Sequence, residues 1–286
     1  YDFIRDADVF VRRRFTLNSQ TLRDENLLNI ALWIDNPPAH NPLHKNGLLS
    51  MIWFAFAIPF IGRRLVSEGV RLFHVGPPPH RFLGHAANIL NAPHKTIATL
   101  LRILYERYLQ RPGKPGVLIR NKGGRYALRY HAEHTANPLS RVTLSDASDA
   151  LGMPRLLIDF RFNTEDAASV VRAHEILDEA LRSAGVGLLD YRVGGADRLD
   201  LVMQQASDGF HQMGTTRMGA SPTTSIVDMN CRVHGLNNLF VVSTSVFPTS
   251  GQAHPTFLGI VIAFRLAKLL ANLRLGAHAE ASDARS

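Results

Sequence analysis

The feature that most constrains the fold is an apolar segment at 256–273, which begins directly after Pro255. Arg265, Lys268 and Asn272 recur at helical spacing and form a narrow polar stripe, so a helix buried on its other sides is predicted. Pro255 suits the first helical position because proline lacks an N–H and its φ is already helical. We therefore expect a long, largely buried helix in the C-terminal quarter.

Two histidines lie in loops that are rich in glycine, serine and threonine. The loops read Phe210-His-Gln-Met-Gly-Thr-Thr-Arg-Met-Gly219 and Ser250-Gly-Gln-Ala-His-Pro-Thr256. An imidazole with its ordinary pKa of about 6.5 exchanges protons efficiently near neutral pH. His211 and His254 are therefore candidates for an acid/base pair.

This region resembles the C-terminal signature of the glucose-methanol-choline (GMC) oxidoreductases, which are flavoenzymes that oxidise alcohols. The matching blocks, in order, are His211 to Gly219, Asp228 to Gly235, Val246 to Gly251 and His254 to Thr256, preceded by Asn137-Pro138, Arg141 to Leu144 and Asp149 to Pro154. They extend over about half of the chain. Several ordered blocks at compatible spacing are more specific than any one of them.

The resemblance implies FAD as cofactor and an alcohol, sugar or polyol as substrate. Alcohol oxidation requires that a hydroxyl proton leave while a hydride goes to flavin N5. We expect His211 to accept that proton and His254 to orient the hydroxyl, although these two roles can be reversed. A lyase of the same family, and a non-catalytic chain that packs against an FAD-bearing partner, are the alternatives. Substrate and electron acceptor stay open.

Two groups of residues are expected to contact FAD. Ser243, Thr244 and Ser245 follow the apolar run 239–242, predicted to be a strand of a parallel sheet, and ligands bind at the carboxyl ends of such strands. His254, Pro255 and Thr256 stand at the start of the long helix, whose N-terminus carries partial positive charge. Many members of the family carry an acidic residue where Ser243 stands, so the resemblance leaves open how the ribityl or pyrophosphate is held.

The chain has no Gly-x-Gly-x-x-Gly sequence after a strand; Gly185-Val-Gly187 lacks the third glycine and opens no helix. Enzymes of the family bind the ADP half of FAD with that loop. We therefore expect this chain to be the C-terminal half of an enzyme that needs an N-terminal FAD-binding half or partner chain. A fragment, a processed chain and a separate subunit are all compatible with this.

The expected fold class is α/β and α+β: the C-terminal part of an FAD-binding Rossmann-like domain, and an antiparallel-sheet substrate domain with helices. The substrate domain is assigned to 1–205, including helical segments at 48–110, and the FAD-domain portion to 206–286. The predicted elements are strands at 27–34, 141–145 and 154–162, helices at 48–62, at 86–109 divided by Pro93 and from about 164 to Gly185, and a hairpin of 117–120 with 125–131.

The strand at 154–162 alternates apolar and polar residues, which predicts one buried face containing Leu156 and Ile158. Asn163 or Thr164 is expected to cap the following helix, because acidic residues occupy its first turn. Its buried stripe is predicted to contain Val170, Leu177 and Leu181.

Composition excludes several other classes of protein. The formal charge is +8, but the basic residues are interpreted as scattered over a solvated surface, and no nucleic-acid motif is present. Cys231 is the single cysteine, and Pro42 separates His40 from His44, so neither a disulfide framework nor a metal site is expected. The apolar segment 48–62 is shorter than the roughly 20 residues that span a bilayer. It is predicted to be a buried or interfacial helix, contact with a membrane surface being the less favoured alternative, and the protein is expected to be soluble, cytoplasmic or periplasmic.

The remaining histidines are interpreted as structural first. His174 lies within a helix and is expected to be a surface or packing residue. His131 and His134 border the segment Glu133 to Asn137, which resembles a part of the family near the active site, so contact with substrate is the alternative for both.

Overall fold

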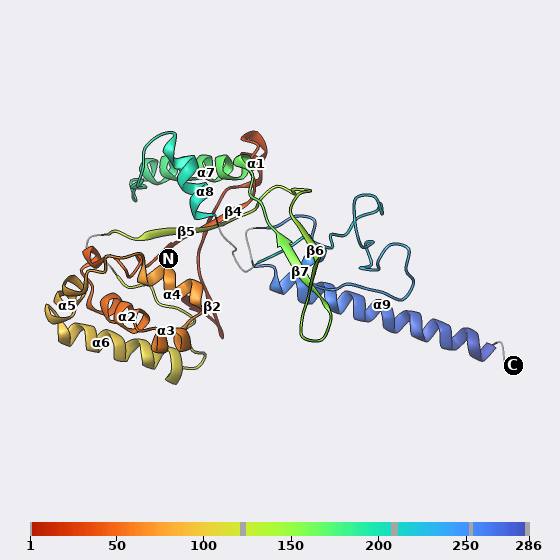
Figure 1. Ribbon diagram of the computed structural model, residues 1–286, viewed down its shortest axis with the longest axis horizontal. Coiled ribbons are helices and arrows are strands. Elements are labelled where there is room, and N and C mark those ends of the chain that lie inside the picture. The colour runs from red at the N-terminus through yellow and green to blue at the C-terminus, as the bar shows by residue number, and fades with distance from the viewer. Residues whose placement is uncertain (1, 121–123, 207–210, 252–253, 284–286) are drawn as a thin grey trace. The chain divides into compact units, whose positions relative to one another are not determined.

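The computed structural model describes residues 2–120, 124–206, 211–251 and 254–283, with side chains up to residue 273. The chain divides into two compact units (Figure 1). Unit 1 comprises Tyr1–Arg14 and Leu32–Arg129, and unit 2 comprises Phe15–Ala31 and Tyr130–Ser286. These boundaries differ from 1–205 and 206–286, and the division by function stays a prediction.

Unit 1 is mainly helical. It contains β1 (Ile4–Asp6), antiparallel to β2 (Val9–Val11), the short helix η1 (Pro42–His44), the helices α2 (Gly47–Ala57), α3 (Pro59–Leu65), α4 (Glu68–Val75), α5 (Phe82–Leu90) and α6 (Pro93–Leu104), and a π-helical turn η2 (Tyr105–Leu109). Its core is centred on Trp53, which is fully buried, stacks on His85 at 4.1 Å between ring centroids and donates a hydrogen bond to the carbonyl of Val75. A Cβ at Gly47 would collide with the Thr96 hydroxyl, so only glycine lets α2 and α6 approach this closely.

The predicted helix at 48–62 is wrong in one respect, because two helices replace it. Ile58 adopts an extended backbone between α2 and α3, and the two helices meet at 108°. Proline at position 59 cannot donate the helical hydrogen bond and begins the new helix instead. The predicted division at Pro93 is confirmed, since α5 ends at Leu90 and α6 begins at Pro93.

Unit 2 holds short sheets and the longest helices. The element β3 (Phe15–Thr16) forms a three-stranded sheet with β4 (Ile30–Asp35) and β5 (Ala127–Ala132), and the chain passes between the units within β4 and β5. The remaining elements are α1 (Ser19–Asp24), the antiparallel pair β6 (Arg141–Ser148) and β7 (Pro154–Asp159), α7 (Thr164–Ser183), α8 (Asp197–Gln205), η3 (Thr244–Val246) and α9 (Thr256–Asp283). Antiparallel sheets beside separate helices confirm an α+β fold class.

The predicted hairpin around residue 121 is also corrected. Residues 117–120 form no strand, and β5 neighbours β4 instead. The side chain of Asn36 forms hydrogen bonds with the backbone of this stretch. It donates to the Val117 carbonyl at 2.7 Å and accepts from the Ile119 N–H at 2.8 Å. The turn residues 121–123 lie outside the described part of the chain.

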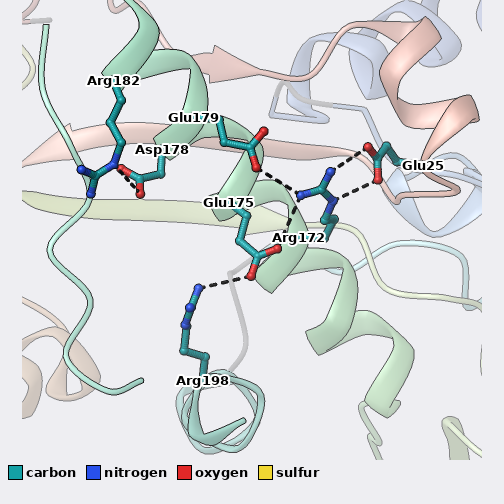
Figure 2. A network of polar contacts seen from close by, with 7 residues as sticks. All are labelled: Glu25, Arg172, Glu175, Asp178, Glu179, Arg182 and Arg198. Carbon is teal, nitrogen blue, oxygen red and sulfur yellow. Dashed lines mark hydrogen bonds and ion pairs between the residues drawn. The ribbon is translucent and has the colours of Figure 1, made fainter. Parts of the chain in front are cut away.

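Helix α7 forms as predicted. Asp166 in its first turn accepts a hydrogen bond from the Asn163 N–H at 2.9 Å, and Val170 and Leu177 are buried. An ion-pair network on its outer surface holds its neighbours (Figure 2). Arg172 makes two hydrogen bonds to Glu25, after α1, while Arg198 on α8 reaches Glu175 at 3.3 Å.

Three predictions of buried surface are wrong. Leu156 and Ile158 on β7 are exposed, because the β6–β7 pair is a two-stranded sheet. Residues 239–242 form no strand; a single bridge joins Phe240 to Arg232. Helix α9 is exposed along most of its described apolar length, instead of being buried around a polar stripe.

Helix α9 is also long and apolar. By length and composition alone, its residues Thr256–Leu273 could cross a membrane, and so could α2 and α3 if the bent pair is counted as one segment. Helix α9 packs its first turn near η3, and Arg265 donates a hydrogen bond to the carbonyl of Met229. Its first turns are therefore held by other segments of unit 2, while most of its described apolar side chains are exposed.

Candidate active site

The structure brings His211 and His254 into direct contact. Their atoms Nε2 and Nδ1 lie 2.7 Å apart, within hydrogen-bonding distance, and the rings stack with centroids 4.4 Å apart. His254 is exposed and His211 is half-buried. In this contact one of the two nitrogen atoms donates and the other accepts.

A third imidazole completes the cluster. His131, on β5, has its ring centroid 5.1 Å from that of His211 and 5.8 Å from that of His254. Nitrogen atoms of the three rings all lie within 4.8 Å of one another, a grouping that can hold a metal ion. The expectation that the chain has no metal site therefore stays a prediction.

Glu133 connects the strand of His131 to the loop of His254. Its carboxylate accepts hydrogen bonds from the Ser250 N–H at 2.9 Å and from the backbone and side-chain amides of Asn29 at 3.2 and 3.0 Å. The Asn29 side chain also donates to the Ser250 carbonyl at 3.0 Å. Both polar groups of the Ser250 backbone are thus held, four residues before His254.

The loop of His211 is held by η3. The hydroxyl of Thr244 donates to the Gln212 carbonyl at 2.9 Å, and the Thr216 N–H donates to the Ser245 carbonyl at 3.0 Å. Ser243 and Ser245 hydroxyls lie 2.5 Å apart. These residues, predicted to bind the cofactor, follow a loop rather than a strand. Thr244 and Ser245 bond the His211 loop directly, while the Ser243 hydroxyl bonds Ser245. Their contact with FAD stays a prediction.

His254 is placed by the start of α9. Pro255 is buried immediately before the first helical residue, Thr256, and its carbonyl accepts the first helical hydrogen bond from Gly259 at 2.9 Å. The N–H groups that precede Gly259 in a helix have no helical acceptor. His254 therefore stands beside a helix end that attracts electron-rich groups.

The segment 228–232 is held by its own hydrogen bonds. The carboxylate of Asp228 accepts from the N–H groups of Asn230 at 2.8 Å and Arg232 at 3.0 Å. Partial burial acts to raise the pKa of Asp228, but these backbone bonds and the Arg232 charge outweigh it and lower that pKa. Arg217 donates a hydrogen bond to the Thr224 carbonyl at 2.8 Å.

His131 and Glu133 are the residues of this site that sequence reasoning undervalued. Side chains two residues apart on a strand share a face, so the His-x-Glu spacing in 131–133 was the available signal. The partner of Glu133, Asn29, is 104 residues away in the chain, and nothing in the sequence indicates that pairing.

The site therefore consists of three clustered imidazoles, with that of His254 beside the N-terminus of α9. A family model described as GMC oxidoreductase matches residues 136–263. Residues 136–263 are thus similar to the C-terminal portion of GMC oxidoreductases.

Individual proteins are similar to about half of the chain. The chain is 30% identical over 139 residues to paromamine 6'-oxidase of Streptomyces fradiae, covering 49% of this chain and 24% of that protein. It is 30% identical over 134 residues to C-glycoside 3-oxidase of Microbacterium trichothecenolyticum, covering 46% and 24%. A solved structure of pyridoxine 4-oxidase from Mesorbium loti is 28% identical and covers 51% of this chain and 30% of that one, with a TM-score of 0.39. The matched region spans about a quarter of the length of the two curated relatives.

Proposed function

We propose that this chain provides the acid/base machinery of an FAD-dependent enzyme that oxidises the CH–OH group of an alcohol, with a sugar or polyol as the preferred class. The observation that carries the proposal is the direct contact between His211 and His254. The printed names of the relatives, an oxidase of paromamine and an oxidase of C-glycosides, support a hydroxylated substrate.

The residues at the start of α9 fit a flavin. The helix N-terminus presents N–H groups without helical acceptors beside exposed His254, and partial positive charge there stabilises an electron-rich ring edge. When bound there, FAD supplies the acceptor of a hydride. His254, Pro255 and Thr256 would contact its pyrimidine edge.

The histidines would manage the proton of the hydroxyl. His211 accepts it at one ring nitrogen, while His254 hydrogen-bonds the same oxygen and holds it in place. A positioned histidine base contributes about 10²- to 10⁴-fold to such a reaction. His131 lies against both rings and limits the directions from which an alcohol can reach them.

The complete enzyme requires a further FAD-binding part. Exposed apolar side chains on α9, among them Phe257 and Phe264, are costly to leave in water, which supports an additional layer of protein on this helix. An N-terminal half or partner chain that binds the ADP part of FAD would supply that layer.

The test uses the complete FAD-loaded assembly under anaerobic conditions. An alcohol that is a substrate should bleach the flavin, and His211→Asn should slow that bleaching by about 10²-fold or more. His94→Asn, an exposed histidine on α6, is the matched control. If no alcohol bleaches the flavin, the lyase alternative is favoured; if His211→Asn and His254→Asn both leave turnover intact, the chain is a passive partner.

A further inference from the structure

The net positive charge of the chain is concentrated in one part of unit 1. Residues 47–116 contain nine basic side chains and two acidic ones, a net charge of +7 out of the formal +8 of the chain. The acidic residues are Glu68, which pairs with Arg63 and Arg71, and Glu106, which lies near Arg102 and Lys114. Basic residues are scattered along the chain as interpreted, but this segment has few acidic residues to balance them, so its net charge favours contact with negative charge.

Exposed apolar side chains accompany this charge on α3. Phe60 is 67% exposed and Leu65 is 59% exposed. The guanidinium of Arg64 lies over the Phe60 ring at 4.2 Å from its centroid, and Arg63 is adjacent. An exposed aromatic ring with arginines beside it suits the boundary between lipid headgroups and acyl chains.

Helix α6 and its π-helical turn present a second apolar stripe. The exposed residues Ile97, Leu101, Leu104 and Tyr108 recur at helical spacing, on a helix whose buried side contacts α2 through Thr96. The exposed basic residues of this helix and its turn are Lys95, Arg102 and Arg107. Both α3 and α6 thus combine uncovered apolar side chains with positive charge.

The arrangement suits a bilayer surface better than a path across it. Helix α2 has eleven residues and α3 has seven, and the 108° bend between them prevents a straight span. Trp53, Leu48 and Leu49 on α2 are buried in the core of unit 1 and unavailable to lipid. Within the described α2–α3 pair, the exposed apolar side chains lie at and beyond the bend, among them Ile58 and Phe60.

We propose that the helical segment 47–116 docks on an anionic phospholipid bilayer, inserting exposed apolar side chains of α3 and α6 while its arginines and lysines contact the headgroups. A nucleic acid would use the positive charge but leave Phe60 and Leu101 in water. The docking does not depend on alcohol oxidation, so each proposal can fail without the other.

The test is flotation of the full chain with vesicles of phosphatidylcholine alone and of phosphatidylcholine mixed with phosphatidylglycerol. Binding should require phosphatidylglycerol and weaken as salt is added. Replacing Arg64, Arg81 and Lys95 by glutamine should weaken binding about fivefold for each charge removed. At least one of Phe60→Ser and Leu101→Ser should weaken it further. Because these positions are exposed, the melting temperature should change little.

Two matched variants lie outside the segment. Leu151→Ser removes a leucine that is 87% exposed, and Arg141→Gln removes an exposed charge; both should bind like the wild type. The proposal is overturned if the chain ignores phosphatidylglycerol, or if only Phe264→Ser on α9 abolishes binding. Three further results would each overturn the proposal. Failure of the complete assembly to bind would show that protein covers the surface. Self-association that Phe60→Ser removes would identify a second copy as the occupant, and displacement of the vesicles by a DNA duplex would identify nucleic acid.

Discussion

Glu133 and Ser250 are joined by a hydrogen bond of 2.9 Å, and this bond connects the strand that carries His131 to the loop that leads to His254. Because Glu133 also accepts from Asn29, one carboxylate holds three segments that are far apart in the chain. The spacing of the imidazoles therefore depends on a residue that is not one of them.

Glu133→Gln should disturb this arrangement. An amide offers one acceptor oxygen in place of two, and a hydrogen bond to a charged group contributes about 1.5–3 kcal/mol. We expect a lower midpoint of urea unfolding and at least about tenfold slower flavin reduction in the complete assembly, through a shift of His254 of the order of 1 Å. The matched change Glu179→Gln, on the outer surface of α7, should slow nothing. Normal flavin reduction in Glu133→Gln would contradict the role of this carboxylate.

His131→Phe keeps a ring beside His211 and His254 but removes its nitrogen atoms. If His131 contacts the substrate, we expect the KM for a polyol to rise more than the KM for a simple primary alcohol, because a polyol offers a further hydroxyl to bind. Steady-state kinetics with a panel of alcohols would measure this. Equal changes for all alcohols would indicate that the ring only packs.

Gly214 has φ of +83°, a conformation that costs other residues free energy, and it lies two residues before Thr216, which bonds Ser245. Gly214→Ala should therefore destabilise the His211 loop by about 1 kcal/mol or more. The rate of limited proteolysis within the His211 loop, compared between Gly214→Ala and the control variant Gly187→Ala, would measure this loss of stability. Gly187 is a suitable control because it has no positive φ and nothing near an added Cβ. Equal cleavage of the two variants would refute the expectation.

His174 predicts how stability changes with pH. Burial, and secondarily the charge of Arg198, lower the pKa of His174 to about 4 from its ordinary 6.5, and its ring packs on Tyr130. Between these values the unfolded chain binds a proton that the folded chain does not. Stability is therefore full above about pH 6.5 and falls toward pH 4, by up to about 3 kcal/mol for this group. Measured by urea unfolding, the His174→Phe variant should lose less stability than the wild type between pH 7 and pH 5. The control variant His94→Phe should behave like the wild type. An unchanged pH dependence in His174→Phe would contradict this prediction.

Arg172 should contribute stability that depends on salt. Its guanidinium binds Glu25 through two hydrogen bonds and lies 3.5 Å from carboxylate oxygens of Glu175 and Glu179 (Figure 2). Arg172→Met should lower the melting temperature at low salt, with a smaller difference at high salt because exposed charges are screened. Arg155→Met, on exposed β7, is the control. A salt-independent loss would point to packing of the side-chain stem instead.

Local elements were predictable where short-range rules determine them. The start of α7 follows from acidic residues after Asn163, and the break between α5 and α6 follows from Pro93, because both effects act within a few residues. The bend before α3 required the structure, since the apolar segment 48–62 was predicted to be one helix. Burial was predicted poorly. The alternation in β7 and the apolar length of α9 indicate surfaces that another layer of protein can cover, but these patterns do not show whether the folded chain covers them.

The sequence by itself determined the residue types of the site, two loop histidines with one directly before Pro255, and their resemblance to the GMC oxidoreductases. These properties lie within short segments, and short segments are what a sequence displays. Only the tertiary structure decided that His131 joins His211 and His254, that Glu133 holds Ser250, and that exposed apolar and basic side chains share the segment 47–116. Those relationships depend on which distant segments the folded chain brings together, and on which surfaces it leaves uncovered.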